Sequence, residues 1–150
     1  MPPPRWRPRR GVPTVGTILG LTIGTAFNAT LNYLTVNNYT LTGYTPEEIV
    51  LASVPMYGYT WPTARLLYNN GLLYGSQYVY PTAYYDNTRY NMLYNRFCNT
   101  YGMPVTVNNT ASGFSSTWFG ANGGFITLSL EPVADQYGRV IYYTAVTMGN

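Results

Sequence analysis

Residues 59–80 read YTWPTARLLYNNGLLYGSQYVY, two runs of aromatic and aliphatic residues on either side of Asn70-Gly71. An Asn-Gly pair suits a two-residue type I′ turn, because both central residues of that turn adopt a positive φ. The stretch therefore predicts a β-hairpin with strands over 59–68 and 72–80. An antiparallel sheet that includes this hairpin is the expected framework of the chain.

Alternating apolar residues extend the strand pattern in both directions along the chain. The segment 15–23 alternates with a period of two, which is typical of a strand. Its glycines Gly16, Gly20 and Gly24 recur every four residues, and we expect them to allow close approach of a helix or of a neighbouring backbone. Further strands are expected over 49–54, 105–107, 114–119, 125–131 and 140–148, with a turn at 135–138 before the last.

Two segments have helical periodicity. The first opens at Gly24-Thr25, with Thr25 as its cap, and ends near residues 37–38. The second has Asp86 as its cap, and Gly102 followed by Pro104 ends it. The apolar stripe of this second helix consists of Tyr90, Leu93, Tyr94, Phe97 and Tyr101.

The chain repeats one pattern: a helix, a tyrosine (Tyr39, Tyr101), strands with Thr-Trp, and an Asn-Gly pair. The predicted fold class is α+β, with two helix-plus-strands repeats in one antiparallel sheet, both helices on one face and the other face free. Residues 1–13 hold five of the eleven prolines and are expected to form an extended Pro/Arg-rich arm. Residues 14–150 are expected to form a single domain.

The composition is unusual for a soluble domain. Only 9% of the 150 residues are charged and there is no histidine, whereas 17 are tyrosine; ordinary domains are about 25% charged. The chain also has no lysine, the residue that commonly keeps protein surfaces apart, and exposed tyrosines favour contact. The net charge of +3 comes from the arm, which leaves no basic patch on the body for nucleic acid.

Residues with catalytic potential are scarce. Without histidine or lysine, the chain cannot form a Ser-His-Asp triad, a Schiff base or a P-loop. Cys98 is interpreted as a small buried hydrophobe. Glu131 and Asp135 flank a turn that is either simply charged or a weak calcium site, and a glycosidase with two carboxylates stays open. The sequence favours a non-enzyme with no cofactor and no metal.

Export is inferred without a visible leader, because residues 15–27 are too rich in glycine and threonine for a signal peptide. No apolar run reaches the roughly 18 residues that a membrane span needs, so no membrane insertion is expected. The expected localisation is extracellular, at the cell surface.

Several motifs support a resemblance: Leu-Gly-Leu-Thr-Ile-Gly-Thr at 19–25, Tyr-Tyr-Asp-Asn-Thr-Arg-Tyr at 84–90, and Trp-Phe-Gly-Ala-Asn-Gly-Gly at 118–124. Together with the basic arm, they are similar to uncharacterised secreted surface proteins of Bacteroidota-like bacteria, some of which resemble subunits of helical extracellular fibrils from environmental samples. The layout resembles the tandem helix-plus-sheet domains of the β-lactamase-inhibitor-protein type and of small outer-membrane-assembly lipoproteins. The resemblance implies a fibril subunit and supplies no catalytic residues.

Self-assembly into an extracellular filament is the favoured function, with copies of the same chain as partners and glycan or cell-surface contact as a further candidate. The arm of one subunit would lie along a groove or sheet edge of the next. The expected assembly interface is Arg5, Trp6, Arg7, Arg9, Arg10, Tyr57, Tyr59 and Trp61. The alternative is a secreted module that binds carbohydrate or protein with sheet aromatics, namely Tyr57, Tyr59, Trp61, Tyr74, Tyr78 and Tyr80.

Overall fold

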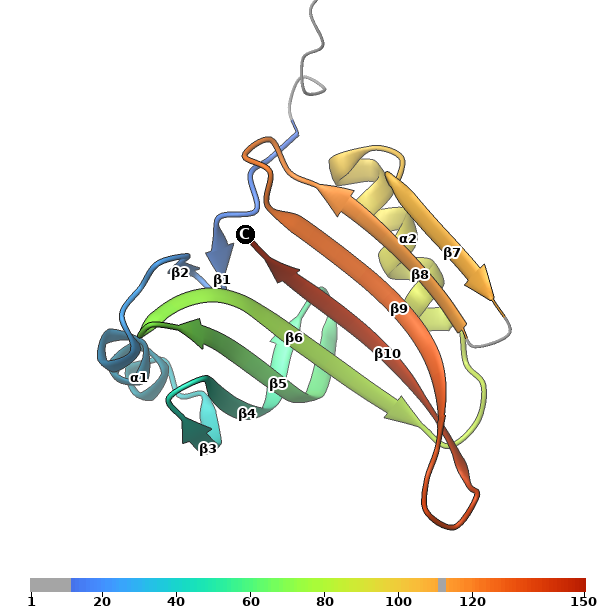
Figure 1. The fold of residues 1–150 in the computed structure, drawn as a ribbon, viewed down its shortest axis with the longest axis horizontal. Coiled ribbons are helices and arrows are strands. Elements are labelled where there is room, and N and C mark those ends of the chain that lie inside the picture. Colours follow the sequence, from blue (N-terminus) through green and yellow to red (C-terminus); the bar gives the residue numbers. More distant parts are fainter. Residues whose placement is uncertain (1–11, 111–112) are drawn as a thin grey trace, which may run out of the picture.

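The computed structural model describes residues 12–110 and 113–150, which form an α+β fold dominated by one antiparallel sheet (Figure 1). The sheet has eight strands in the order β3-β4-β5-β6-β10-β9-β8-β7. A separate two-stranded sheet pairs β1 (Thr17–Ile18) with β2 (Leu21–Thr22). The helices are α1 (Phe27–Val36) and α2 (Thr88–Tyr101).

Each helix is followed by four strands of the large sheet. After α1 come β3 (Thr40–Thr45), β4 (Glu48–Met56), β5 (Tyr59–Asn69) and β6 (Leu72–Thr82). After α2 come β7 (Thr106–Thr110), β8 (Gly113–Phe119), β9 (Phe125–Ala134) and β10 (Val140–Gly149). The two sets join where β6 pairs with β10, from Thr82 opposite Tyr142 to Gly75 opposite Gly149.

The predicted hairpin between β5 and β6 is confirmed. Asn70 and Gly71 have φ values of 52° and 77°, as a type I′ turn requires. The turn also anchors α1, because Phe27 N–H donates to the carbonyl of Gly71 at 3.1 Å. The sequence signal therefore fixes a turn that positions a helix as well as a hairpin.

One face of the large sheet carries the core. Leu51, Ala64, Tyr78, Val146 and Leu128 lie opposite one another across five adjacent strands, and all are fully buried. Burying such side chains is the main favourable term in folding, at about 25 cal/mol per Å² of apolar surface.

Both helices pack on this core face. The rings of Phe97 in α2 and Trp118 in β8 are 5.4 Å apart, and those of Phe27 in α1 and Tyr68 in β5 are 5.1 Å apart. Figure 1 shows α1 beside the β3–β6 half of the sheet and α2 beside β7, β8 and β9. In the described part of the chain, no helix covers the opposite face.

The segment 15–23 does not form the single strand predicted from its alternation. Leu19 and Gly20 have φ values of 52° and 86°, which turn the chain back on itself between β1 and β2. The predicted close approach of a helix is confirmed at Gly20, where a Cβ atom would lie 2.5 Å from the hydroxyl of Tyr33 in α1. That hydroxyl donates to the carbonyl of Leu19 at 2.7 Å.

The helix ends agree with the sequence at α2 better than at α1. Thr25 is not the cap of α1, because its hydroxyl donates to the carbonyl of Thr22 and Ala26 occupies the N-cap position. Asp86 precedes the N-cap of α2, and its carboxylate accepts the Thr88 N–H at 3.0 Å. Gly102, with φ of 90°, ends α2 as predicted.

Candidate functional site

Aromatic residues of the β4–β5 hairpin meet α2 in an aromatic–arginine cluster. Tyr57 and Gly58 form the tight turn of that hairpin, with φ values of 54° and 81°. The Tyr57 ring lies 5.2 Å from that of Phe97. The guanidinium of Arg96, one residue before Phe97 in α2, lies 4.8 Å from the centre of the Tyr57 ring.

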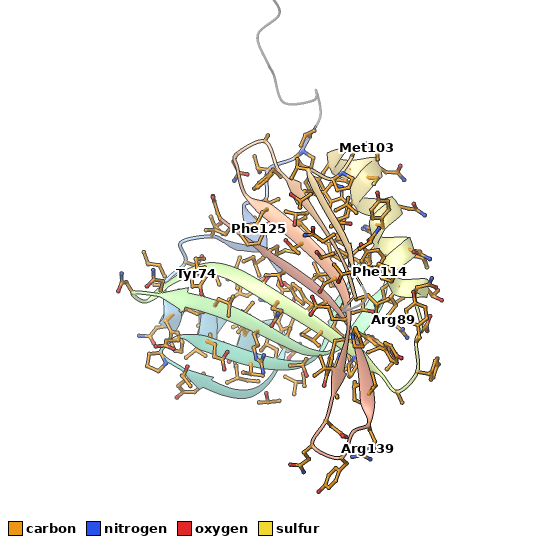
Figure 2. The ribbon with its side chains drawn as sticks, turned by 45° about the vertical axis from the view of Figure 1, so that its right-hand side comes forward. Tyr74, Arg89, Met103, Phe114, Phe125 and Arg139 are labelled. Atoms are coloured by element: carbon orange, nitrogen blue, oxygen red, sulfur yellow. The ribbon has the colours of Figure 1, made fainter. Side chains whose placement is uncertain are left out.

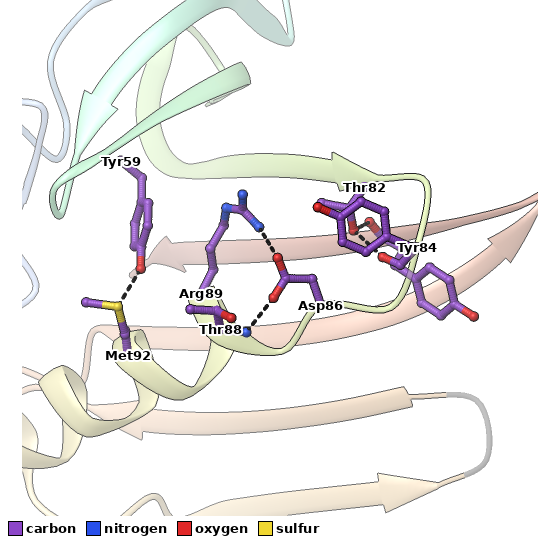
Figure 3. A network of polar contacts seen from close by, with 8 residues as sticks. Tyr59, Thr82, Tyr84, Asp86, Thr88, Arg89 and Met92 are labelled. Carbon is purple, nitrogen blue, oxygen red and sulfur yellow. Dashed lines mark hydrogen bonds and ion pairs between the residues drawn. The ribbon is translucent and has the colours of Figure 1, made fainter.

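Arg89 is the second cation of this cluster (Figure 3). Its guanidinium lies 3.7 Å from the centre of the Tyr80 ring and 3.4 Å from the Asp86 carboxylate. Beside it, the Tyr59 hydroxyl donates to the sulfur of Met92 at 2.9 Å. Partly buried cation–π contacts of this kind contribute about 1–2 kcal/mol each. The cluster therefore holds the hairpin against α2.

Tyr57 and Tyr78 stay protonated at physiological pH. Burial raises the pKa of Tyr57 to about 12; the nearby Tyr101 adds to the rise and Arg96 opposes it. Burial also raises the pKa of Tyr78, which is fully buried on β6. A general base needs a pKa near the working pH. Tyr57 and Tyr78 are therefore neutral groups whose rings pack on Phe97 and Trp61.

Of the expected interface residues, only Tyr57, Tyr59 and Trp61 lie in the described part of the chain, and these three do not share one exposed surface. Tyr57 and Tyr59 are half-buried members of the aromatic–arginine cluster. Trp61 was expected at the interface, but it is 0% exposed and its indole N–H donates to the carbonyl of Met56 at 3.0 Å. Its ring is buried in the core of its own chain, so Trp61 is not available for an interface with another subunit. The interface residues Arg5, Trp6, Arg7, Arg9 and Arg10 lie outside the described residues.

The aromatic platform of the alternative function is also corrected. Trp61 and Tyr78 are both buried, whereas Tyr74 is 43% exposed. Tyr74 lies where the register between β5 and β6 shifts, so it leaves the alternation of its neighbours (Figure 2). The six residues therefore do not offer one continuous stacking surface.

The chain enters the fold across the loop between β8 and β9. The Ala121 N–H donates to the carbonyl of Pro13 at 3.1 Å, and the Val15 N–H donates to the side-chain oxygen of Asn122 at 3.2 Å. Cβ atoms added at Gly120 or Gly124 would come within 2.9 Å of this backbone. The Trp-Phe-Gly-Ala-Asn-Gly-Gly motif therefore forms a cradle for residues 13–15, which sequence reasoning missed.

The second face of the large sheet, called here the open face, carries mostly small neutral side chains. One row across the strands is Thr117, Thr127, Thr147, Gln77 and Arg65; a second row is Ser115, Ser129, Ala145, Val79 and Thr63. The hydroxyls of the first two threonines are 2.9 Å apart. The arginine lies 3.7 Å from the Glu48 carboxylate, so its charge is compensated. In residues 125–131 of the sequence, apolar residues that face the core alternate with residues such as Thr127 and Ser129 that face the open side.

The five carboxylates and the cysteine all lie in the described part of the chain. No group of three or more histidine, cysteine or acidic residues there could hold a metal ion. The Asp135 carboxylate accepts the N–H groups of Tyr137 and Arg139 and pairs with the Arg139 side chain at 2.8 Å, which makes it a turn-forming residue. Cys98 is half-buried and packs against the core.

Among the described residues, no helix is long and apolar enough to cross a bilayer. No protein-family model, curated protein or solved structure matches the chain at a significant level.

Proposed function

We propose that the protein is a structural subunit without catalytic activity that self-assembles into an extracellular filament. The observation that supports this proposal best is the open face. It crosses the large sheet, it has no helix over it in the described part of the chain, and its two central rows are almost entirely neutral. Sheets with small side chains pack face to face at a spacing of about 10 Å.

The low charge of the open face favours contact between identical copies. Like charges opposite one another across an interface are costly, and Arg65 with Glu48 is a compensated pair on this face. Ser and Thr hydroxyls are both donors and acceptors, so rows of them can pair with the same rows of a second copy. A contact between two open faces is isologous and closes as a dimer.

Growth into a filament needs a second contact of a different kind, and the proposal assigns it to the arm. The cradle around 120–124 holds residues 13–15, so the basic segment 1–11 joins the body at one fixed place. The outermost strands β3 and β7 consist almost entirely of exposed residues, and among the described residues each pairs with one strand of the large sheet, so each presents an outer edge to a neighbour. An arm that reaches such an edge makes a head-to-tail contact, which propagates.

We also infer that the chain is an internal repeat. The order helix, strand, strand, strand, strand occurs twice, and the last strands of the two sets, β6 and β10, pair antiparallel at the centre. This arrangement supports a pseudo-twofold relation between residues 27–82 and 88–149. Such a relation would give the open face two similar halves for contact with a second copy.

The assembly proposal is tested with the full chain, a version lacking residues 1–11, and Thr147→Arg. The truncation stops at residue 11 because Pro13 accepts a hydrogen bond in the cradle. Thr147 lies in a central row of the open face. We expect filaments of the full chain in negative-stain electron microscopy, dimers of the truncated chain in light scattering, and monomers when Thr147→Arg is made in the truncated chain.

Thr100→Arg is the matched control, because Thr100 is exposed in the last turn of α2, away from the open face. A cation near the C-terminus of a helix is favourable, so this variant should fold and form filaments like the parent. Circular dichroism melts confirm that both arginine variants are folded. A full chain that stays monomeric at millimolar concentration, or a truncated Thr147→Arg chain that still forms dimers, would overturn the proposal.

A further inference from the structure

A groove runs along α2 on the side away from the aromatic–arginine cluster, between this helix and strands β7 and β8. It has a volume of about 290 Å³. Pockets for small ligands have volumes of about 300–1,000 Å³, so the groove lies at the small end of that range. We call it the α2–β7 groove and define it by the residues that matter here: Asn87, Tyr90, Asn91, Tyr94, Asn109 and Phe114.

Helical and strand periodicity bring these residues together. Asn87, Tyr90, Asn91 and Tyr94 are spaced three and four residues apart, so they lie on one side of α2. Asn109 is opposite Phe114 in the pairing of β7 with β8. Phe114 lies on the same face of β8 as Ser116, which contacts α2. The groove is therefore built by regular elements.

Aromatic rings form the wall and floor of the groove. The rings of Tyr90 and Tyr94 are stacked with centres 6.2 Å apart, and the Phe114 ring lies 6.1 Å from that of Tyr90. The Tyr90 hydroxyl and Ser116 Oγ are 2.9 Å apart in a buried hydrogen bond that fixes the ring of the floor. Tyr94 packs on Trp118 at 5.5 Å. These rings are held in place before any ligand arrives.

Three amides complete the groove. The side chains of Asn87, Asn91 and Asn109 are exposed and make no hydrogen bond within residues 12–110 and 113–150. Each amide offers two donor hydrogens and an acceptor oxygen, which match a hydroxyl group that also donates and accepts. Among the described residues, no charged side chain lines the groove. A phosphate, carboxylate or amine would therefore find no opposite charge, and a purely apolar ligand would leave the amides unused.

We propose that the α2–β7 groove binds one or two rings of a neutral saccharide. The C–H faces of a pyranose ring would lie on the tyrosine and phenylalanine rings, and its hydroxyls would bond to the three amides. Rigid aromatic contact with adaptable amide hydrogen bonds is also how antibody binding loops combine affinity with polarity. The site is independent of the contact between open faces, because it lies on the helix side of the sheet and leaves the open face free.

The test is isothermal titration of the full chain with five neutral oligosaccharides: cellohexaose, maltohexaose, xylohexaose, mannohexaose and chitohexaose. Hexagalacturonate serves as the charged comparison. We expect binding of at least one neutral sugar and none of hexagalacturonate. Asn91→Ala and Asn109→Ala should each weaken that binding at least tenfold, because each removes a hydrogen-bonding amide from the groove.

Two asparagines supply matched controls. Asn95 follows Asn91 by one helical turn, but it lines a separate pocket with Tyr57 and Arg96 and does not line the α2–β7 groove. Asn108 lies on the other face of β7 from Asn109. Asn95→Ala and Asn108→Ala should bind the sugar like the parent. The proposal is overturned if none of the five sugars binds at 10 mM, if hexagalacturonate binds as well as the neutral sugars, or if all four alanine variants behave alike. None of these results depends on the contact between open faces.

Discussion

At the residue scale, position 124 requires glycine because the backbone of Val15 passes close to it. An added Cβ atom would lie 2.7 Å from the carbonyl oxygen of Val15. Gly124→Ala should therefore displace residues 13–15 and lower the free energy of unfolding by about 1–3 kcal/mol, as overpacking does. Urea denaturation measures this change. Gly43→Ala is the control, because an added Cβ there has open space and should leave stability nearly unchanged.

Tyr57 predicts how stability depends on high pH. Its pKa is raised by burial to about 12, whereas a tyrosine in an unfolded chain titrates near 10. The native state thus holds a proton that the unfolded state releases, so the contribution of Tyr57 is complete below pH 10 and is lost as the pH rises toward 12. Urea denaturation between pH 9 and 11.5 should show a decline that is shallower in Tyr57→Phe. An equal slope in both proteins would contradict this account.

The same residues show the limit of single-residue prediction. Composition identifies a chain rich in aromatic residues, but Trp61 and Tyr74 lie close in sequence and only the tyrosine reaches the surface. Which ring is buried depends on strand phase and on the register shift between β5 and β6, and these are set by pairing. The amides of the α2–β7 groove were missed for the same reason, because Asn109 meets α2 only after β7 has paired with β8.

At the scale of elements, the carboxylate of Asp86, the residue before the N-cap, holds the start of α2. The carboxylate of Asp86 accepts the Thr88 N–H and lies 3.4 Å from Arg89. Hydrogen bonds from Thr88 are the main reason that the pKa of Asp86 lies below its usual value. The stabilisation is therefore present above pH 4 and is lost as the pH falls through the lowered pKa.

Asp86→Asn tests the contact between this carboxylate and the Thr88 N–H. At pH 7 the variant should melt at a lower temperature than the parent, because a neutral amide is a weaker acceptor near a helix N-terminus. At pH 2 the two melting temperatures should converge. Thermal melts followed by circular dichroism make the comparison. A difference that stays constant across this pH range would assign the effect to something other than the charge.

Local signals predicted most elements well, and the misses have physical reasons. The β5–β6 turn and the end of α2 depend on Gly71 and Gly102. Both have a positive φ, which glycine adopts readily, so the sequence predicts both positions. Strand β3 was missed because it is an edge strand with almost no buried residue, so it lacks the apolar alternation that marks a strand. The cap of α1 was misplaced because hydrogen bonds to the distant 71–73 segment hold its start.

The whole molecule depends on a pairing that no local pattern reveals. An antiparallel sheet with two helices was predictable from periodicity, but Tyr78 of β6 and Val146 of β10 are opposite each other across 68 residues of sequence. Contacts across this seam are extensive. Phe97 of α2 packs on Tyr57, and Arg89 packs on Tyr80. Each half of the chain therefore completes the core of the other.

Cutting the chain between residues 83 and 84 tests this mutual dependence. Fragment 1–83 leaves the partner edge of β6 free over 75–82, and fragment 84–150 leaves β10 free over 142–149. Each also exposes core rings that the other half covers, so neither should melt cooperatively in calorimetry. Mixing equal amounts should restore the sheet signal in circular dichroism and one cooperative transition. A fragment that melts sharply alone would mean that the halves are separate domains, and the open face would then be two surfaces instead of one.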